Sequence, residues 1–203
     1  MMTEVLNWGG VNVWLFHAIN GVHNLWWDRL MIIGAQLTEN EHVAILVGFA
    51  LIIGTIVKRR SDSESNWFRT SLVLGVSYVL TSATVFGVKH MVASARPAEL
   101  LPREMVRILA VPGDPYSFPS GHAALVAMLV TALWPRLSIP ARVAALFFVV
   151  WVGLARVAVG AHFPADVIAG ALIGALLTWL IRLLVDRILR PVTTSTSPLD
   201  VKL

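Results

Sequence analysis

Three short segments of the chain carry the residue types that phosphate chemistry requires. In order, they are Lys89 to Pro97 (K-x6-R-P), Pro119 to His122 (P-S-G-H) and Arg156 to Asp166 (R-x5-H-x3-D). Together they supply three cations, two histidines, one carboxylate and a Pro-Ser-Gly sequence that can start a helix. Attack on phosphorus spreads negative charge over the equatorial oxygens, so fixed cations and N–H donors lower the barrier. The set predicts binding and transfer of a phosphoryl group.

The cations and the helix start are the candidate phosphate-binding groups. Lys89, Arg96 and Arg156 form a candidate clamp for the anion. Ser120 and Gly121 open a helix whose first N–H groups have no partner within the helix, and such a helix start binds anions. Gly121 lets the backbone approach phosphate closely, and the Ser120 hydroxyl adds a donor.

The two histidines divide the chemistry between them. His162 lies four residues before Asp166, with Pro164 suited to the first position of a helix. The Asp166 carboxylate could therefore hold one imidazole nitrogen while the other faces phosphorus. A histidine oriented in this way is a nucleophile, and His122 is left as the acid that protonates the leaving oxygen.

Each segment taken alone has a simpler interpretation. Lys89 at the end of an apolar helix would be a snorkelling anchor, and Arg156 with Asp166 would be an ion pair between two spans. The presence of all three segments favours a site over these alternatives. The remaining histidines have no motif context and are interpreted as packing or interfacial residues: His17, His23, His42 and His90.

In their order and spacing, the three segments resemble the signature of the type 2 phosphatidic acid phosphatase superfamily. The resemblance implies proton donation by His122, a phosphohistidine at His162 and orientation of His162 by Asp166, with no metal or other cofactor. It implies phosphate binding by Lys89, Arg96, Ser120, Gly121 and Arg156. The chain departs from the family pattern at Ala155, where a serine is usual, and one hydroxyl contact is lost.

The composition indicates a membrane protein. Of the 203 residues, 57% are hydrophobic and 14% are charged, with a mean hydropathy of +0.73, whereas globular domains have about 25% charged residues. The soluble haloperoxidases of the same superfamily are excluded by this hydropathy. The absence of cysteine excludes disulfides. We expect the lipid bilayer and a membrane lipid phosphate as partners and no nucleic acid; the oligomeric state stays open.

We predict an all-α integral membrane protein with about six transmembrane helices. Five apolar runs are candidate spans: 42–57, 68–88, 121–135, 141–159 and 164–185. An interfacial helix over 11–19 and a further span over about 26–37 precede them, the latter with two tryptophans at headgroup level. Five spans with one re-entrant or interfacial segment are the alternative. Residues 1–192 would form the membrane-embedded phosphatase domain, and residues 193–203 a polar, disordered tail.

The distribution of Lys and Arg predicts the orientation. With six spans and the N-terminus inside, eleven of the sixteen Lys and Arg residues are cytoplasmic. The positive-inside rule then places the three motifs at the extracytoplasmic face, toward the periplasm or the cell exterior. All three motifs reach the same face in this arrangement.

The N-terminal region refines the expected substrate. Its pattern resembles that of the bacterial undecaprenyl-diphosphate phosphatases of the bacitracin-resistance type at Asn20, Asp28, Met31, Thr38 and Glu39. The resemblance implies conversion of undecaprenyl diphosphate to undecaprenyl phosphate, the lipid carrier of peptidoglycan synthesis. Two arginines between the first two motifs, Arg103 and Arg107, would meet the second phosphate or, equally, be solvated loop charges.

Other functions remain open from the sequence. The chain could hydrolyse phosphatidylglycerol phosphate or phosphatidic acid, or pass the phosphoryl group to another lipid such as lipid A. A non-catalytic lipid-phosphate carrier or translocator is the alternative outside enzymes. Retention of His122, His162 and Asp166 disfavours the carrier, because anion binding needs cations and not a nucleophile with an orienting carboxylate.

Overall fold

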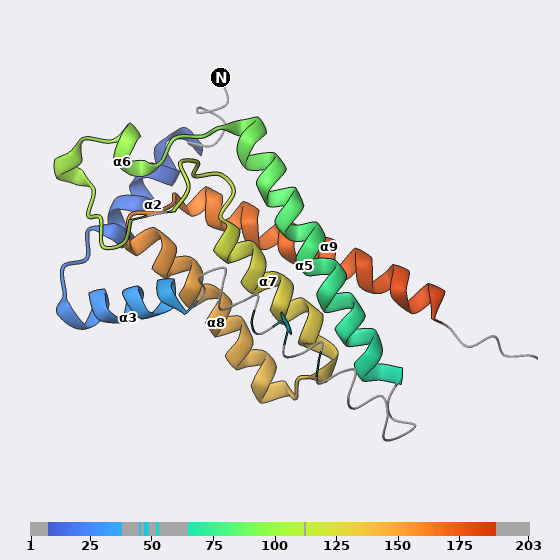
Figure 1. Cartoon of the computed structure of the whole chain (residues 1–203). Coiled ribbons are helices and arrows are strands. Elements are labelled where there is room, and N and C mark those ends of the chain that lie inside the picture. The colour runs from blue at the N-terminus through green and yellow to red at the C-terminus, as the bar shows by residue number, and fades with distance from the viewer. Residues whose placement is uncertain are drawn as a thin grey trace, which may run out of the picture.

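The computed structural model describes residues 8–37, 45, 47–48, 52, 65–111 and 113–189, and the regular structure within them is helical (Figure 1). The α-helices are α2 (Val11–Asn20), α3 (Leu25–Gln36), α5 (Ser65–Val92), α6 (Pro97–Leu100), α7 (Gly121–Leu133), α8 (Ile139–Ala158) and α9 (Pro164–Ile188). Short 3-10 helices are η1 (Trp8–Gly10), η3 (Arg103–Met105) and η4 (Trp134–Arg136). The predicted all-α class is confirmed.

Four long helices, α5, α7, α8 and α9, lie side by side and run diagonally in Figure 1. Helix α7 packs against each of the other three and is the most enclosed, with every residue from Ala123 to Met128 buried. The core between α5, α7 and α9 is apolar, with Leu74, Met128 and Ile181 among its buried residues. Burying one such side chain contributes about 1.5–3 kcal/mol.

Close backbone contact joins α7 to α9. A Cβ built on Gly170 would lie 2.2 Å from the Ser120 carbonyl oxygen, and one on Gly174 would lie 2.0 Å from that of Ala124. No side chain fits at either glycine without separating the helices. This confirms that these two glycines serve helix packing, as small residues do between membrane helices.

The three longest helices have the length and apolarity of membrane spans: the one that includes α5, α8 and α9. At a rise of about 1.5 Å per residue, even α8, with its 20 residues, extends about 30 Å, the thickness of the hydrocarbon core. Their outer faces carry exposed apolar side chains such as Phe147, Leu172 and Val79. The chain is therefore a multi-pass membrane protein.

The N-terminal helices pack on α8 and confirm the predicted helices at 11–19 and 26–37. Helix α3 begins at Asn24, whose Oδ1 accepts hydrogen bonds from the amides of Trp26 (2.8 Å) and Trp27 (3.3 Å). Its 12 residues extend about 18 Å, less than a bilayer core. The predicted span at 42–57 and the tail at 193–203 lie largely or wholly outside the described residues. The count of six spans thus stays a prediction.

Two buried asparagines of α2 hydrogen-bond to the backbone near the third motif and to the segment around Arg107. Asn12 Oδ1 accepts from the Ala165 amide at 3.0 Å, in the first turn of α9. Asn20 Nδ2 donates to the carbonyls of Arg107 and Ala158, both at 2.8 Å, and its Oδ1 accepts from the Arg107 amide. Gly160 adopts a φ of 82°, and a Cβ there would lie 2.3 Å from the Arg107 carbonyl oxygen. Glycine is required at this contact.

Candidate active site

The residues of all three motifs meet at one end of the four-helix bundle. Lys89 is in the last turn of α5 and Arg156 in the last turn of α8. Ser120 is the N-cap of α7, and Asp166 is in the first turn of α9. Because these helices alternate in direction, two C-terminal ends and two N-terminal ends converge, and His162 lies in the turn between α8 and α9.

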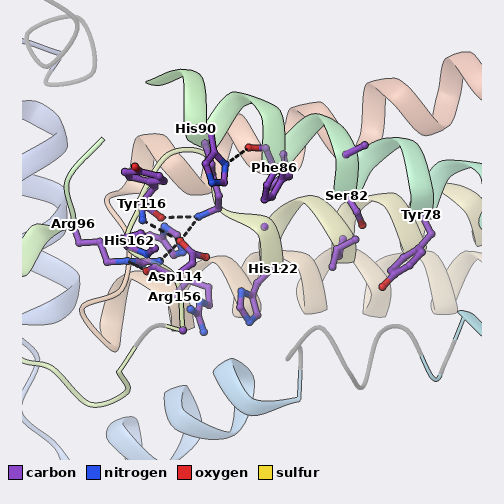
Figure 2. Close-up of a pocket in the computed structure, with 17 residues that line it drawn as sticks. Tyr78, Ser82, Phe86, His90, Arg96, Asp114, Tyr116, His122, Arg156 and His162 are labelled. Atoms are coloured by element: carbon purple, nitrogen blue, oxygen red, sulfur yellow. Dashed lines mark hydrogen bonds and ion pairs between the residues drawn. The ribbon is translucent and has the colours of Figure 1, made fainter. Parts of the chain in front are cut away.

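A cavity of about 710 Å³ opens between these helix ends (Figure 2). Its polar end contains the predicted clamp and both histidines: Lys89, Arg96, Arg156, His122 and His162. From there, its lining continues along α5 through Phe86, Ser82 and Tyr78, as Figure 2 shows. Tyr78 precedes Lys89 by eleven residues, about 16 Å along the helix. We call this stretch the α5 arm.

The His162 and Asp166 side chains lie next to each other in the interior, each 2% exposed. His162 Nδ1 is 3.6 Å from Asp166 Oδ2, slightly beyond hydrogen-bond distance. The same oxygen accepts hydrogen bonds from the Phe163 amide at 2.9 Å and from the Ser117 hydroxyl. The carboxylate is thereby fixed, and the imidazole faces it through Nδ1. This leaves Nε2 as the nitrogen available for chemistry.

Burial decides the charge of His162. The interior location lowers the pKa of His162 to about 4, although the Asp166 carboxylate opposes the shift. The ring is therefore uncharged at neutral pH. An uncharged imidazole has the free electron pair that a nucleophile needs.

The start of α7 presents its backbone to the cavity. Gly121 and His122 line the cavity, whereas Ser120 is fully buried behind them and does not line it. The Ser120 hydroxyl lies 3.5 Å from the amide of Ala123, in the capping position, and the Ser120 amide donates to the Asp166 carbonyl at 2.9 Å. The Ser120 side chain thus serves the helix start, and its direct contact with phosphate stays a prediction.

A carboxylate that the motifs do not include sits among the cations. Asp114 Oδ1 lies 3.0 Å from Lys89 Nζ, 3.0 Å from Arg96 Nη2 and 3.1 Å from the Tyr116 amide. Partial burial works to raise the pKa of Asp114, but its hydrogen bonds and ion pairs with Lys89 and Arg96 prevail and hold it below the usual value. The carboxylate is therefore ionised at neutral pH.

Sequence reasoning missed both Asp114 and Ser117. They precede the Pro-Ser-Gly-His motif by a few residues, in a segment without hydrophobic periodicity. The available signal was weak, because the segment between the first two motifs holds two other acids, Glu99 and Glu104, and nothing in its pattern distinguishes Asp114 or Ser117. His90, which we interpreted as a packing or interfacial residue and which is the histidine nearest in sequence to Lys89, also lines the cavity, and its Nδ1 lies 2.8 Å from the Phe86 carbonyl oxygen.

The two arginines predicted to meet a second phosphate or to be loop charges, Arg103 and Arg107, lie outside the cavity lining. Arg107 Nη2 pairs with Asp28 Oδ2 at 2.6 Å, and its Nη1 donates to the Val22 carbonyl. Arg103 is exposed on η3. The ion pair with Asp28 gives Arg107 a structural role, and contact of either arginine with a second phosphate stays a prediction.

The N-terminal pattern has a structural explanation. Asn20 and Asp28 hold the Arg107 segment against the turn before α9, and Met31 is buried against α8. Thr38 and Glu39 lie outside the described residues. These contacts support the site from outside and do not line the cavity.

The model of the PAP2 superfamily matches residues 70–190, which include every motif residue. The chain belongs to the PAP2 superfamily. It is accordingly a membrane phosphatase of the lipid phosphate class, and the predicted family is confirmed.

Relatives of this PAP2 chain have different substrates in their names. It is 29% identical over 177 residues to an undecaprenyl-diphosphatase of Sulfolobus acidocaldarius, covering 84% of this chain and 77% of that protein. It is 48% identical over 62 residues to a lipid A 1-phosphatase of Rhizobium johnstonii, covering 29% of this chain. That match spans about a quarter of the Rhizobium protein's length (24%).

Solved structures share the fold. Aquifex aeolicus LpxE superposes with a TM-score of 0.70 at 26% identity, covering 84% of this chain and 94% of that one. A transmembrane PAP2 type phosphatidylglycerolphosphate phosphatase from Bacillus subtilis gives 0.68 at 22% identity, covering 89% and 87%. The second likeness concerns the fold alone.

Proposed function

We propose that this PAP2 phosphatase removes the terminal phosphate of a lipid diphosphate, undecaprenyl diphosphate in the first place, through a phosphohistidine at His162. The observation that carries the proposal is the cavity, in which a cationic end with two histidines continues into the α5 arm, where apolar side chains such as Val85, Phe86 and Leu125 contribute to the lining. A lipid phosphate has the same two parts, a charged head and an apolar chain. The likeness to the Sulfolobus undecaprenyl-diphosphatase over 84% of the chain supports the choice of lipid.

The first half-reaction transfers the phosphoryl group to the enzyme. The phosphate lies among Lys89, Arg96 and Arg156, with the first amides of α7 directed at it. His162 Nε2 forms a bond to phosphorus while the bond to the leaving lipid oxygen breaks. His122 donates the proton that this oxygen takes up.

The second half-reaction restores the enzyme. A water molecule attacks the phosphohistidine and gives a proton to His122, while the bond between phosphorus and Nε2 breaks. Inorganic phosphate leaves. Asp166 stabilises the cationic phosphorylated ring from the Nδ1 side in both steps.

We further propose that the site faces the periplasm or the cell exterior. The opposite end of the bundle carries Arg69, Arg136, Arg142, Arg182 and Arg187. Two of them bind backbone carbonyls at that end: Arg69 donates to Leu189, and Arg182 donates to Thr131 at 3.2 Å. The excess of basic residues on one side is typical of the cytoplasmic face.

A panel assay with purified protein tests the substrate. Phosphate release would be measured for undecaprenyl diphosphate, lipid A, phosphatidylglycerol phosphate and phosphatidic acid. We expect the highest kcat/KM for undecaprenyl diphosphate and no release by His162→Ala. Equal or better use of a monophosphate lipid would refute the diphosphate assignment.

Lipid A 1-phosphate is the second candidate, because the local identity to the Rhizobium lipid A 1-phosphatase reaches 48%. The same panel decides between the two lipids. A higher kcat/KM for lipid A than for undecaprenyl diphosphate would select it.

The α5 arm allows a separate test of lipid binding. Ser82→Trp would fill the arm, whereas Val79→Trp places the same side chain on the same helix at a residue that is 62% exposed and outside the cavity. We expect Ser82→Trp to raise KM for a long-chain lipid phosphate and to leave a short water-soluble phosphate ester unaffected. Equal effects of the two substitutions on KM would refute binding of the lipid chain in the α5 arm.

A further inference from the structure

Asp114 occupies donors of the clamp to which we assign the substrate phosphate. One carboxylate oxygen, Oδ1, is bound by both Lys89 Nζ and Arg96 Nη2, each at 3.0 Å. An equatorial oxygen of a bound phosphate would need the same two donors. In the empty site, the Asp114 carboxylate therefore occupies the position expected for a phosphate oxygen.

The exposure of these groups gives their order from the cavity inward. The Asp114 side chain is 53% exposed, whereas those of Lys89 and Arg96 are 9% and 8% exposed. Asp114 also lines the cavity (Figure 2). A phosphate that enters from the cavity thus meets cations already engaged by the carboxylate.

The clamp does not depend on the carboxylate for its orientation. Arg96 Nε donates to the backbone carbonyl of Asp114 at 3.0 Å, and its Nη1 donates to that of Ala161 at 2.6 Å. Lys89 Nζ donates to the Tyr116 carbonyl at 2.6 Å. These backbone contacts remain when the Asp114 side chain turns away. One charged donor on each cation then becomes available to phosphate.

We propose that Asp114 is an internal competitor for the phosphate clamp. It pairs with Lys89 and Arg96 in the empty site, yields to the substrate phosphate and returns when inorganic phosphate leaves. The proposal rests on the proposed function, because it assumes that Lys89 and Arg96 bind phosphate. Its consequence is weaker binding of the product than the cations alone would give, which favours release.

Binding of inorganic phosphate tests the proposal directly. Isothermal titration of the purified full chain would compare the native protein with Asp114→Asn, which keeps the size of the side chain and removes its charge. We expect the Kd for phosphate to fall by about tenfold, because the competing charge-assisted bonds are lost. Asp114→Ala, which removes the acceptor as well, should show at least the same fall.

Glu104→Gln is the matched control. Glu104 is exposed on η3 at the same end of the bundle and does not line the cavity. The Glu104→Gln substitution should leave the Kd for phosphate within about twofold of native, because exposed charges at a distance are screened by salt. An equal fall in the Kd for phosphate in Glu104→Gln would assign the effect to net charge and overturn the proposal.

Unchanged or weaker phosphate binding in both Asp114 variants would also overturn it, since Asp114 would then be a support for the cations and not a competitor. Absence of phosphate binding in every form would do the same. The titration measures binding and not turnover. A failure of the lipid assignment would therefore appear in the panel assay alone.

Discussion

Replacing Ser117 with alanine removes one of the two donors that fix the Asp166 carboxylate. Ser117 is fully buried, and its hydroxyl donates to Asp166 Oδ2, the oxygen that faces His162. A hydrogen bond to a charged group is worth about 1.5–3 kcal/mol. The Phe163 amide still donates to the same oxygen at 2.9 Å, so we expect the lower value. That corresponds to a fall of about tenfold in kcat.

The assay separates a positioning role from a general loss of structure. Because Ser117 acts through Asp166 and does not line the cavity, kcat should fall while the Kd for inorganic phosphate stays within about twofold of native. Ser117→Cys, which retains a weak donor of similar size, should recover part of the loss.

Thr178→Val provides the control for removal of a buried hydroxyl. Thr178 is also fully buried, and its hydroxyl donates to the Gly174 carbonyl at 2.7 Å, on α9 and away from the cavity. This variant should keep the native kcat. If Ser117→Ala kept kcat within twofold of native, or if Thr178→Val lost as much, the reasoning about Asp166 would be refuted.

Four further results are expected. Phosphate release should survive excess EDTA and be blocked by vanadate; full loss with EDTA that Mg²⁺ restores would contradict a metal-free phosphohistidine mechanism. The ¹⁵N signals of the His162 ring should titrate with a midpoint near pH 4, because burial lowers the pKa of His162 to about 4, so the ring charges only as the pH falls through that value; a midpoint at the ordinary value of about 6.5 would contradict the neutral nucleophile. In this Cys-free chain, a cysteine at exposed Glu99 should react with an impermeant thiol reagent outside intact cells, and one at exposed Ser138 should not; the reverse labelling would invert the proposed orientation. Arg107→Gln should lower the free energy of unfolding by about 1–3 kcal/mol, because Asp28 loses its partner, and leave the order of lipid substrates unchanged; a changed order would return Arg107 to substrate binding.

The long helices and the meeting of the motifs could be predicted from the sequence because they depend on local patterns. Apolar runs of about 20 residues identified α5, α8 and α9. Lys89 closes α5 and Pro164 opens α9, so the number of crossings between them already places both at one end. Predicting that the motifs meet required only the order of the membrane crossings and no side-chain contacts.

The contacts of the connecting segment could not be predicted in this way. Asp114 is 25 residues from Lys89, and Ser117 is 49 residues from Asp166. Which carboxylate or hydroxyl reaches which partner depends on the course of a loop without periodicity. The same applies to Arg107, whose partner Asp28 is 79 residues earlier in the chain.

The close contact of Gly170 and Gly174 with the α7 backbone has a consequence for how such enzymes diversify. It makes α7 and α9, which carry His122 and Asp166, a single block that tolerates almost no substitution at the contact between the two helices. The α5 arm lies on a different helix, and side chains form its lining at Tyr78 and Ser82. Replacing residues on one face of α5 could therefore adapt the enzyme to a new lipid chain without altering the geometry of phosphoryl transfer.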